Sequence, residues 1–279
     1  MDDIERFIAE DVGRGDITSE GLLDDTLAVG YIYPKKRCLL AGLEEAEAVF
    51  RHLGLKTRRH ATDGKWVRPR SPVLTVQGRA ADILTGERLA LNFLMRMSGI
   101  ATETGKLARF CARKGMKVQI AGTRKTVPGF REYDKKAIVL GGGWSHRMGL
   151  YDGILIKDNH IRLVSISEAV AKLKPLQIPI EVEVSDLNQA LDAAKAGAAM
   201  VMLDNMTPEH ARKVSTALRQ SYPNVKIEIS GGVTPENIKR YAKSADIISL
   251  GYLTHSVRAV DFSMDLEPAQ SPKRRVKSC

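Results

Sequence analysis

The sequence predicts an α/β protein in which a mixed first third is followed by parallel β/α units. Six short apolar runs lie between residues 117 and 251, and most start roughly 20 to 26 residues after the previous one. Helical patterns such as SDLNQALDAAKAGA separate several of these runs. Regular alternation of strand and helix implies parallel units. Six such strands favour a barrel or near-barrel of the TIM type, and a doubly wound open sheet is the alternative.

The first hundred residues lack this rhythm. Residues 27–42 and 71–80 resemble strands bounded by proline and glycine, and residues 42–54 have apolar residues at helical spacing and end at a glycine. A longer helical pattern runs from Leu84 to Arg113. We expect Gly99 to break or kink this helix, because glycine costs about 1 kcal/mol relative to alanine inside a helix.

Two helices of the later region have clear start signals. Residues 207–221 and 234–245 each begin with threonine and proline, and a glutamate follows. Threonine is a favoured N-cap residue, and proline is tolerated in the first turn. We therefore expect a threonine cap on both helices.

Composition and charge narrow the class of protein. The chain carries 43 Lys and Arg against 33 Asp and Glu, a net charge of +10, which favours anionic partners. Four of these cations lie in the last seven residues, so we predict a disordered basic tail over 269–279. Three widely spaced cysteines suggest neither a disulfide framework nor a zinc site. No apolar run approaches the ~18 residues of a membrane span, and no signal peptide is apparent, so we expect a cytoplasmic enzyme.

Reactive side chains follow the predicted strands one after another. In a β/α barrel the carboxyl ends of the strands form the catalytic face. Six such placements in succession make chance unconvincing as an explanation. The residues are Arg124, Lys125, Lys157, Glu183, Asp204, Ser230, Gly231, Gly232, Gly251 and His255.

The carboxylates and the cations among them suggest different ligands. Glu181 and Glu183 share one strand face, and a carboxylate inside a barrel is costly unless it is paired or binds something. Glu183 and Asp204 could hold sugar hydroxyls or Mg²⁺. The cations Arg124, Lys125, His146, Arg147 and Lys157 are expected to converge on a ligand with several anionic groups.

Glycine-rich turns follow the last two strands, at Gly231–Gly232 and Gly251. Such turns let backbone N–H groups approach a phosphate, although glycine could also serve only to make the turn. The sequence GGGWSHR is neither a dinucleotide nor an ATP loop. Arg131 is expected to hold the neighbouring Pro-Gly turn, and Lys135 and Lys136 to lie on the ordinary surface.

These motifs together resemble those of the quinolinate phosphoribosyltransferases. The similarity runs through EDVGRGDITSE, LNFLMRMSGIAT, TRKTVPGFR, GGGWSHRMGLYDGILIKDNHI, EVEV, LDN, SGG and GYLTHS, and covers nearly the whole chain before the tail. The resemblance implies an N-terminal α/β sandwich domain over 1–105, completed by about 257–268. It also implies an open, irregular TIM-like α/β barrel over 106–256.

The resemblance further implies an activity and a role for each matching residue. The family transfers phosphoribosyl from phosphoribosyl pyrophosphate to quinolinate with Mg²⁺, giving nicotinate mononucleotide, pyrophosphate and CO₂. Arg124, His146, Arg147 and Lys157 would bind the quinolinate carboxylates, Lys125 the pyrophosphate, and Glu183 and Asp204 the ribose with Mg²⁺ nearby. Ser230, Gly231, Gly232 and Gly251 would cradle the 5′-phosphate beside His255. Arg96 would reach the site of the other subunit of a homodimer or larger assembly.

The chain departs from the family at a few positions, and other functions stay open. Ser145 stands where the family commonly has Asn, and Leu140 where it has Cys. A molybdenum-transport-associated group of the same family generally lacks the KDNH segment that is intact here. A Schiff-base aldolase using Lys157 is a second alternative. A nucleic-acid binder is a third, but we do not expect nucleic acid as the principal partner, because no RNA-binding signature is present.

Overall fold

The computed structural model describes residues 3–269, which form two compact units. One unit contains the chain up to Gly99 and from Arg258 onward, and the other is Ile100–Val257. The sequence-based boundary after residue 105 falls inside a continuous helix, which is why no composition change marks it. The prediction of a basic tail over 269–279 concerns residues of which all but the first lie outside the described part of the chain.

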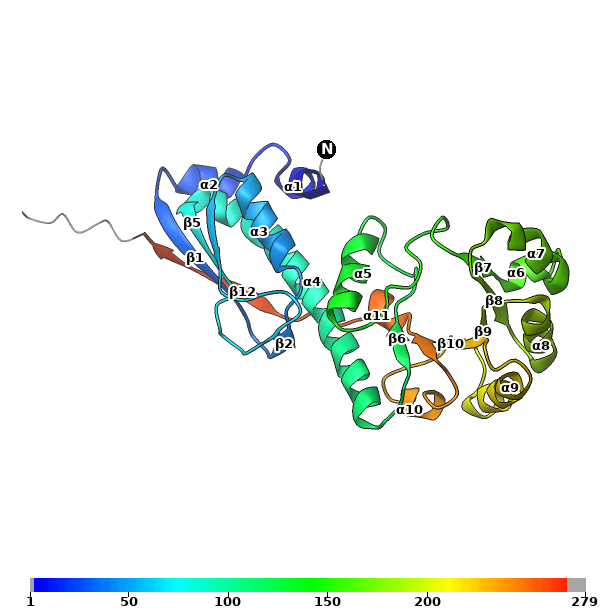
Figure 1. Cartoon of the computed structure of the whole chain (residues 1–279). Helices are drawn as coiled ribbons and strands as arrows, with labels where there is room; N and C mark the ends of the chain where they lie inside the picture. Colours follow the sequence, from blue (N-terminus) through cyan, green and yellow to red (C-terminus); the bar gives the residue numbers. More distant parts are fainter. Residues whose placement is uncertain (1–2, 270–279) are drawn as a thin grey trace, which may run out of the picture. The chain divides into compact units, whose positions relative to one another are not determined.

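The N-terminal unit is built on an antiparallel sheet with helices. Its four strands follow the order β12-β1-β5-β3, and the last strand of the chain pairs with β1 from Ala28↔Pro268 to Pro34↔Phe262 (Figure 1). The strands are β1 (Leu27–Pro34), β3 (Lys56–Arg59), β5 (Leu74–Arg79) and β12 (Phe262–Pro268), with the small pair β2 (Cys38–Leu39) and β4 (Trp66–Val67). The helices are α1 (Asp3–Val12), α2 (Ile17–Leu22), α3 (Leu43–His52) and the first part of α4 (Ala80–Arg113).

Helix α4 continues through Gly99, so the expected break at this residue is wrong. A Cβ atom at Gly99 would lie 2.5 Å from the carbonyl oxygen of Arg258 and 3.1 Å from Cα of Ala259. Glycine is therefore required by the close approach of the returning chain. The helical pattern of the surrounding residues outweighs the modest propensity cost of one glycine.

The C-terminal unit is a six-stranded parallel sheet with the order β6-β11-β10-β9-β8-β7. From β7 to β11 each strand lies beside the one that precedes it, and β6 lies beside the last strand, β11. This circular order is that of a barrel, whereas a doubly wound sheet reverses direction. Among the described residues β6 and β7 do not pair, so the barrel is open. The strands are β6 (Gln119–Ala121), β7 (Ile154–Ile156), β8 (Ile180–Val184), β9 (Met200–Asp204), β10 (Lys226–Ser230) and β11 (Ile247–Ser249).

Helices cover one face of this sheet. α8 contacts β8 and β9, and α7, α8 and α9 lie together outside the strands (Figure 1). The helices of this unit are the second part of α4, α5 (Arg131–Leu140), α6 (Asp158–Ile161), α7 (Ile166–Leu173), α8 (Leu187–Ala196), α9 (Pro208–Ser221), α10 (Ile238–Tyr241) and α11 (Tyr252–His255), with the 3₁₀ turn Lys174–Leu176.

The two faces of the sheet differ in chemistry. Val182, Val201 and Ile229 belong to the apolar core shared with the helices. Side chains alternate along a strand, so the neighbours of these core residues in the sequence point to the opposite, inner face of the sheet. Glu183 and Glu228 are two of these neighbours. The interior of a small barrel is usually filled by bulky branched residues. Here carboxylates occupy part of it, which directs attention to the carboxyl ends of the strands.

One of the two expected threonine caps is present. The Thr207 side chain accepts a hydrogen bond from the N–H of His210 at 3.3 Å, and Pro208 begins helix α9. The other prediction is wrong, since α10 begins at Ile238 without a side-chain cap. Asn237 instead closes the preceding turn, with its side chain bonded to the N–H of Thr234 at 2.8 Å and to the carbonyl of Gly232 at 2.9 Å.

Candidate active site

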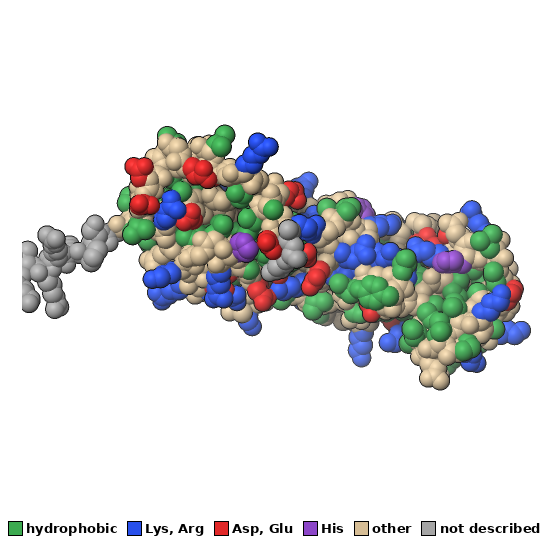
Figure 2. Space-filling model, turned by 90° about the horizontal axis from the view of Figure 1, so that it is seen from above, with side chains coloured by type: hydrophobic (Ala, Val, Ile, Leu, Met, Phe, Trp, Pro, Cys, Tyr) green, Lys and Arg blue, Asp and Glu red, His purple; other side chains and the backbone are tan. Residues whose placement is uncertain are grey.

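A cavity of about 440 Å³ opens at the carboxyl ends of the barrel strands. Most of the site residues predicted from the sequence line it, although they come from six separate segments of the chain. These residues are Arg124, Lys125, His146, Arg147, Lys157, Glu183, Asp204, Ser230, Gly231 and Gly232. Lys and Arg side chains form a band across the C-terminal unit in Figure 2, as expected for a surface that attracts anions.

Three predicted residues do not line this cavity. Gly251 lies next to His255 and to the lining residue Lys125, because a Cβ at Gly251 would be 2.8 Å from Nε2 of His255 and 3.5 Å from Cδ of Lys125. Arg96 belongs to the N-terminal unit. All predicted groups of this set except Arg96 belong to the C-terminal unit.

The triple glycine leads the chain alongside β6 and into the cavity. The N–H of Trp144 donates to the carbonyl of Ile120 at 2.8 Å, and the N–H of Gly122 donates to that of Trp144 at 3.0 Å. A Cβ at Gly141 would lie 2.6 Å from Cβ of Thr104. These glycines thus allow tight packing against helix α4, and the extended residues after them carry His146 and Arg147 to the cavity.

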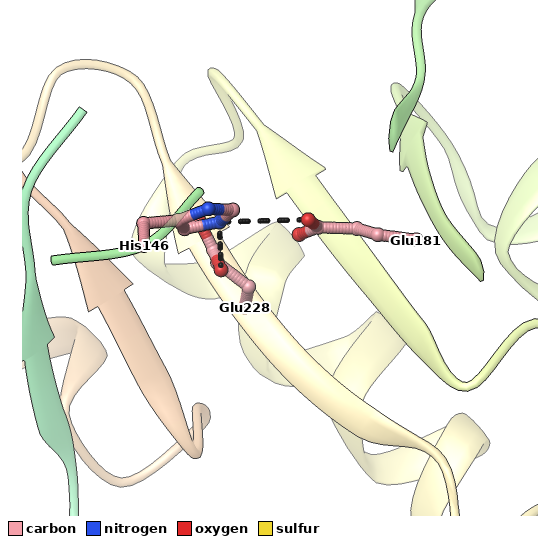
Figure 3. A group of neighbouring side chains, drawn as sticks. All are labelled: His146, Glu181 and Glu228. Carbon is pink, nitrogen blue, oxygen red and sulfur yellow. Dashed lines mark hydrogen bonds and ion pairs between the residues drawn. The ribbon is translucent and has the colours of Figure 1, made fainter. Parts of the chain in front are cut away.

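Two buried glutamates hold the ring of His146, as Figure 3 shows. Nε2 of His146 lies 3.2 Å from Oε2 of Glu228 and 3.5 Å from Oε2 of Glu181. Burial lowers the pKa of His146, but the hydrogen bonds and charges of the two glutamates outweigh burial and raise the pKa to about 9. Burial is also the main cause that raises the pKa of Glu181, to about 7. Nε2 therefore carries a proton beside these carboxylates.

The other ring nitrogen of His146 faces the main chain. The N–H of Arg147 donates to Nδ1 at 2.8 Å, which requires a lone pair on that atom. This bond favours a neutral ring with its proton on Nε2, whereas the glutamates favour the doubly protonated ring. The two influences agree only on the proton at Nε2. The hydrogen bond from the N–H of Arg147 therefore belongs to the neutral ring, the form that prevails above the raised pKa of about 9.

Lys135 is buried, so the expectation that it lies on the ordinary surface is wrong. Its side chain is 1% exposed and its Nζ donates to the carbonyl oxygen of Ser145. Burial, helped by the positive charge of Arg131, lowers the pKa of Lys135 to about 8. A basic pair on a helix looks solvated in the sequence, and only the packing of α5 shows that one member points inward. Lys136 is half-buried.

Arg131 joins two loops at the base of the site. Its Nε donates to Oγ1 of Thr126 at 3.2 Å, and its NH1 nitrogen donates to the carbonyl of Met148 at 3.3 Å. The contact with Thr126 lies next to the Pro-Gly turn that Arg131 was expected to hold. The contact with Met148 adds the segment that follows Arg147.

An opposite rim of the cavity carries carboxylates. Nζ of Lys157 lies 3.7 Å from Oε2 of Glu183, and these side chains are 47% and 13% exposed. Burial raises the pKa of Glu183, although Lys157 acts in the opposite direction. Oδ2 of Asp204 accepts from the side chain of Asn205 at 2.6 Å. A second cavity of about 940 Å³ shares Glu183, Asp204 and Asn205 with the first.

The turn after β10 fits a phosphate-binding loop. Gly231 and Gly232 have φ angles of 80° and 65°, a region that favours glycine. A Cβ at Gly231 would overlap the side chain of Asn205 and approach its backbone nitrogen to 2.8 Å. The turn therefore needs glycine for its shape and for the close approach of Asn205, which follows β9.

On the other side of the cavity, Nε of Arg124 is buried and, within residues 3–269, has no hydrogen-bond partner. An unsatisfied guanidinium donor in a cavity wall is costly unless an acceptor occupies the cavity. This observation favours an anionic ligand beside Arg124.

Comparison with known protein families agrees with this geometry. The family model for the N-terminal domain of quinolinate phosphoribosyl transferase matches residues 16–98, and the model for its C-terminal domain matches residues 100–265. The chain belongs to the quinolinate phosphoribosyltransferase family. The boundary between the two family models lies at the boundary of the compact units after Gly99, whereas the C-terminal model also covers residues 258–265, which belong to the N-terminal unit.

Curated relatives in this family match nearly the full chain. A probable nicotinate-nucleotide pyrophosphorylase (carboxylating) of Methanothermobacter thermautotrophicus is 40% identical over 274 residues, covering 95% of this chain and 98% of the relative. The Homo sapiens nicotinate-nucleotide pyrophosphorylase (carboxylating) is 37% identical over 250 residues, covering 87% and 84%. The solved nicotinate-nucleotide pyrophosphorylase of Francisella tularensis superposes with a TM-score of 0.88 at 35% identity, covering 95% and 94%.

Glu228 is a charged residue of the site that the sequence-based prediction did not include. Glu228 lies in the middle of β10, is fully buried and lines the cavity. A glutamate at an inner-face position of the strand KIEIS was the available signal, as it was for Glu181 and Glu183. Its partner could not be found without the structure, because His146 lies 82 residues away in the chain.

Two carboxylate sets could hold a metal. Glu183 and Asp204 offer the oxygen ligands that Mg²⁺ prefers, and both face the cavity, so they fit the ion that the family implies. The ligand atoms of His146, Glu181 and Glu228 lie within 4.8 Å of one another. In this second set the hydrogen bonds already account for the geometry.

No helix within residues 3–269 is both long and apolar enough to span a bilayer.

Proposed function

We propose that this protein transfers the phosphoribosyl group of phosphoribosyl pyrophosphate to quinolinate and releases CO₂. The products are nicotinate mononucleotide and pyrophosphate. The observation that carries the proposal is one cavity in which cations, carboxylates and a glycine-rich turn meet in a chain of this family. The cations match the two carboxylates of quinolinate, and the carboxylates match the ribose hydroxyls.

Different residues of the cavity bind different groups of the two substrates. Arg124, Arg147 and Lys157 bind the quinolinate carboxylates, and Lys125 meets the pyrophosphate. The turn Ser230–Gly232 receives the 5′-phosphate through backbone N–H groups, with Gly251 and His255 next to Lys125. Glu183 and Asp204 hold the ribose, and Mg²⁺ at these carboxylates would neutralise charge on the pyrophosphate.

The chemistry needs positioning and charge more than covalent catalysis. The quinolinate nitrogen attacks C1 of the ribose while the bond from C1 to the pyrophosphate oxygen breaks. Glu183 stabilises the positive charge that develops on the ribose. When the adjacent carboxylate departs as CO₂, its bonding electron pair stays on the ring carbon, where the positive charge of the quaternary nitrogen stabilises it. This carbon then takes a proton. The cations hold two anions together that would repel each other in water.

The decisive assay supplies quinolinate labelled in its 2-carboxylate, phosphoribosyl pyrophosphate and Mg²⁺. Labelled CO₂ and nicotinate mononucleotide should form in equal amounts. Nicotinate in place of quinolinate should react poorly, because it lacks the carboxylate that departs. Omitting Mg²⁺ and adding a chelator should abolish turnover if the ion acts at Glu183 and Asp204. Product formation without CO₂ release would contradict the proposal.

The Schiff-base alternative has less support from the site. Lys157 is half-exposed and lies beside Glu183. A nucleophilic lysine is activated by an apolar pocket or by cationic neighbours, and the contact of Lys157 with Glu183 opposes the effect of the cations that line the same cavity. We also propose that the enzyme works as a homodimer or larger assembly in the cytoplasm, with Arg96 acting in the site of a second subunit and without nucleic acid as principal partner.

A further inference from the structure

Residues 144–147 are held in place by contacts with several separate segments of the C-terminal unit. The main chain of Trp144 pairs with the β6 segment, and the carbonyl of Ser145 accepts from Lys135. The ring of Trp144 stacks on that of His146, with centroids 4.6 Å apart. His146 itself has a φ angle of 54°, a conformation that few residues other than glycine adopt. Such a backbone persists only where its surroundings fix it.

Glu228 and Glu181 provide the contacts beneath this segment. Both project from the inner face of the barrel, from the strands on either side of β9, and direct one oxygen each at Nε2 of His146. Their other oxygens, both Oε1, are buried and have no hydrogen-bond partner within the described chain. A buried carboxylate is costly. The apolar core does not need these residues, since it packs on the other face of the sheet.

The ring of His146 connects these carboxylates to Arg147. Its Nε2 proton faces the glutamates, and its Nδ1 atom receives the N–H of Arg147. Both ring nitrogens are therefore used within the protein. The guanidinium that follows lines the cavity and donates to the carbonyl of Gly153 at 3.4 Å.

We propose that Glu228, with Glu181, is a positioning residue for quinolinate binding: it fixes the ring of His146, which in turn orients Arg147 toward the substrate carboxylate. His146 then acts through the placement of Arg147 and not by donating a hydrogen bond to quinolinate. This inference rests on the proposed function, since it concerns the same cavity.

The test compares Glu228→Gln with Glu228→Met. Glutamine keeps an oxygen acceptor at the same position, whereas methionine keeps the length and removes the acceptor. We expect Glu228→Met to raise the KM for quinolinate by at least about tenfold, in line with the loss of a hydrogen bond to a charged group. The KM for phosphoribosyl pyrophosphate should change less than about twofold, and Glu228→Gln should restore most of the quinolinate affinity. Equal rises in both KM values, or no rescue by glutamine, would overturn the proposal.

A double-mutant cycle separates positioning from general loss of structure. In a His146→Leu background, Glu228→Met should cause no further rise in the KM for quinolinate, because its effect passes through the ring. Additive effects would contradict this route. Thermal unfolding of each variant shows whether the protein is folded at the assay temperature.

A spectroscopic readout does not depend on turnover. The protein has six histidines, and ¹⁵N NMR of their rings, assigned with His146→Leu, reports which nitrogen carries the proton. We expect His146 at pH 10, above its raised pKa of about 9, to be protonated on Nε2 and unprotonated on Nδ1. A ring protonated on both nitrogens would overturn the link to Arg147. If the wild-type protein shows the expected ring form but does not convert quinolinate, the proposed function fails while the arrangement at His146 stands.

Discussion

Arg147 shows how a single side chain at this site depends on its surroundings. Its guanidinium lines the cavity, its N–H bonds to His146, and burial together with the charge of Arg124 lowers its pKa. Two arginines side by side repel each other, and the carboxylates of the barrel interior offset part of that repulsion. An anionic ligand between the arginines would offset more, and this is the basis of their proposed role.

Replacing Arg147 with alanine should weaken quinolinate binding selectively. We expect the KM for quinolinate to rise by at least about tenfold and kcat to fall, because a charge-assisted hydrogen bond is lost. The KM for quinolinate of Arg147→Lys should lie between those of wild type and Arg147→Ala. Lysine keeps the positive charge but cannot make the paired hydrogen bonds of a guanidinium to a carboxylate. Steady-state kinetics with each substrate varied in turn gives the measurement. The control is Arg219→Ala on helix α9, which removes a surface ion pair between Arg219 and Asp246. This variant should leave both KM values unchanged. Wild-type kinetics for Arg147→Ala would refute the carboxylate clamp.

Lys135 should give the free energy of unfolding a measurable pH dependence. Its pKa is about 8 in the folded protein and the ordinary value is 10.5, so the unfolded chain binds more protons between these pH values. The contribution of Lys135 to stability therefore rises with pH across this window, by up to about 3 kcal/mol. Urea unfolding of wild type and Lys135→Met from pH 7.5 to 10.5 measures the difference between them. Lys114→Met, at an exposed position, should show no such trend. A constant difference between wild type and Lys135→Met would exclude a buried, shifted lysine.

At the scale of elements, the parallel strands and their helices are visible in the sequence because each carries its own periodicity. The inner and outer faces of β8 and β10 follow directly from the alternation of Glu and Val or Ile. The continuity of α4 through Gly99 and the late start of α10 were not visible. Both are decided by neighbours that are distant in the sequence or by a competing turn, and local propensity says nothing about either.

The first glycine of GGG should be intolerant of even a methyl group. Gly141 has a helical φ of −72°, so alanine is allowed by the backbone, but its Cβ would lie 2.6 Å from Cβ of Thr104 and 2.8 Å from the carbonyl of Ala101. We expect Gly141→Ala to destabilise the protein by about 1–3 kcal/mol through overpacking. Gly21→Ala in helix α2, where nothing lies within 4 Å, should be neutral or slightly stabilising. Chemical denaturation of wild type and both variants measures these changes in the free energy of unfolding. Equal stabilities would argue against tight packing at Gly141.

At the scale of the whole molecule, the described cavity contains every proposed quinolinate ligand except one. Arg96 lies on the part of α4 that belongs to the N-terminal unit. It falls within residues 16–98, which match the N-terminal family model. The proposed assembly places this residue in the site of a second subunit. Whether the site is shared can be tested by mixing two inactive proteins.

Mixtures of Arg96→Ala and Lys157→Ala should regain activity if Arg96 acts in the partner's site. After random subunit exchange about half of the dimers are mixed, and each has one intact site, so about a quarter of the wild-type activity should return. Mixtures of Arg147→Ala and Lys157→Ala should stay inactive, because both residues line the same cavity of one chain. Assays before and after exchange under mild denaturant provide the measurement. No recovery in the first mixture would place Arg96 in the site of its own chain.

The sequence by itself indicated the family, a parallel α/β unit of barrel type, and the identity of most cavity residues, and the openness of the barrel was implied by the family resemblance. It could do so because strand alternation and strand-end motifs are local properties of the chain. The tertiary structure alone decided which residues support that cavity. Lys135 looked like a surface residue, and the partnership of Glu228 with His146 was invisible, because burial and contact depend on how distant segments pack. The opposing demands on the two nitrogens of His146 arise from the same packing.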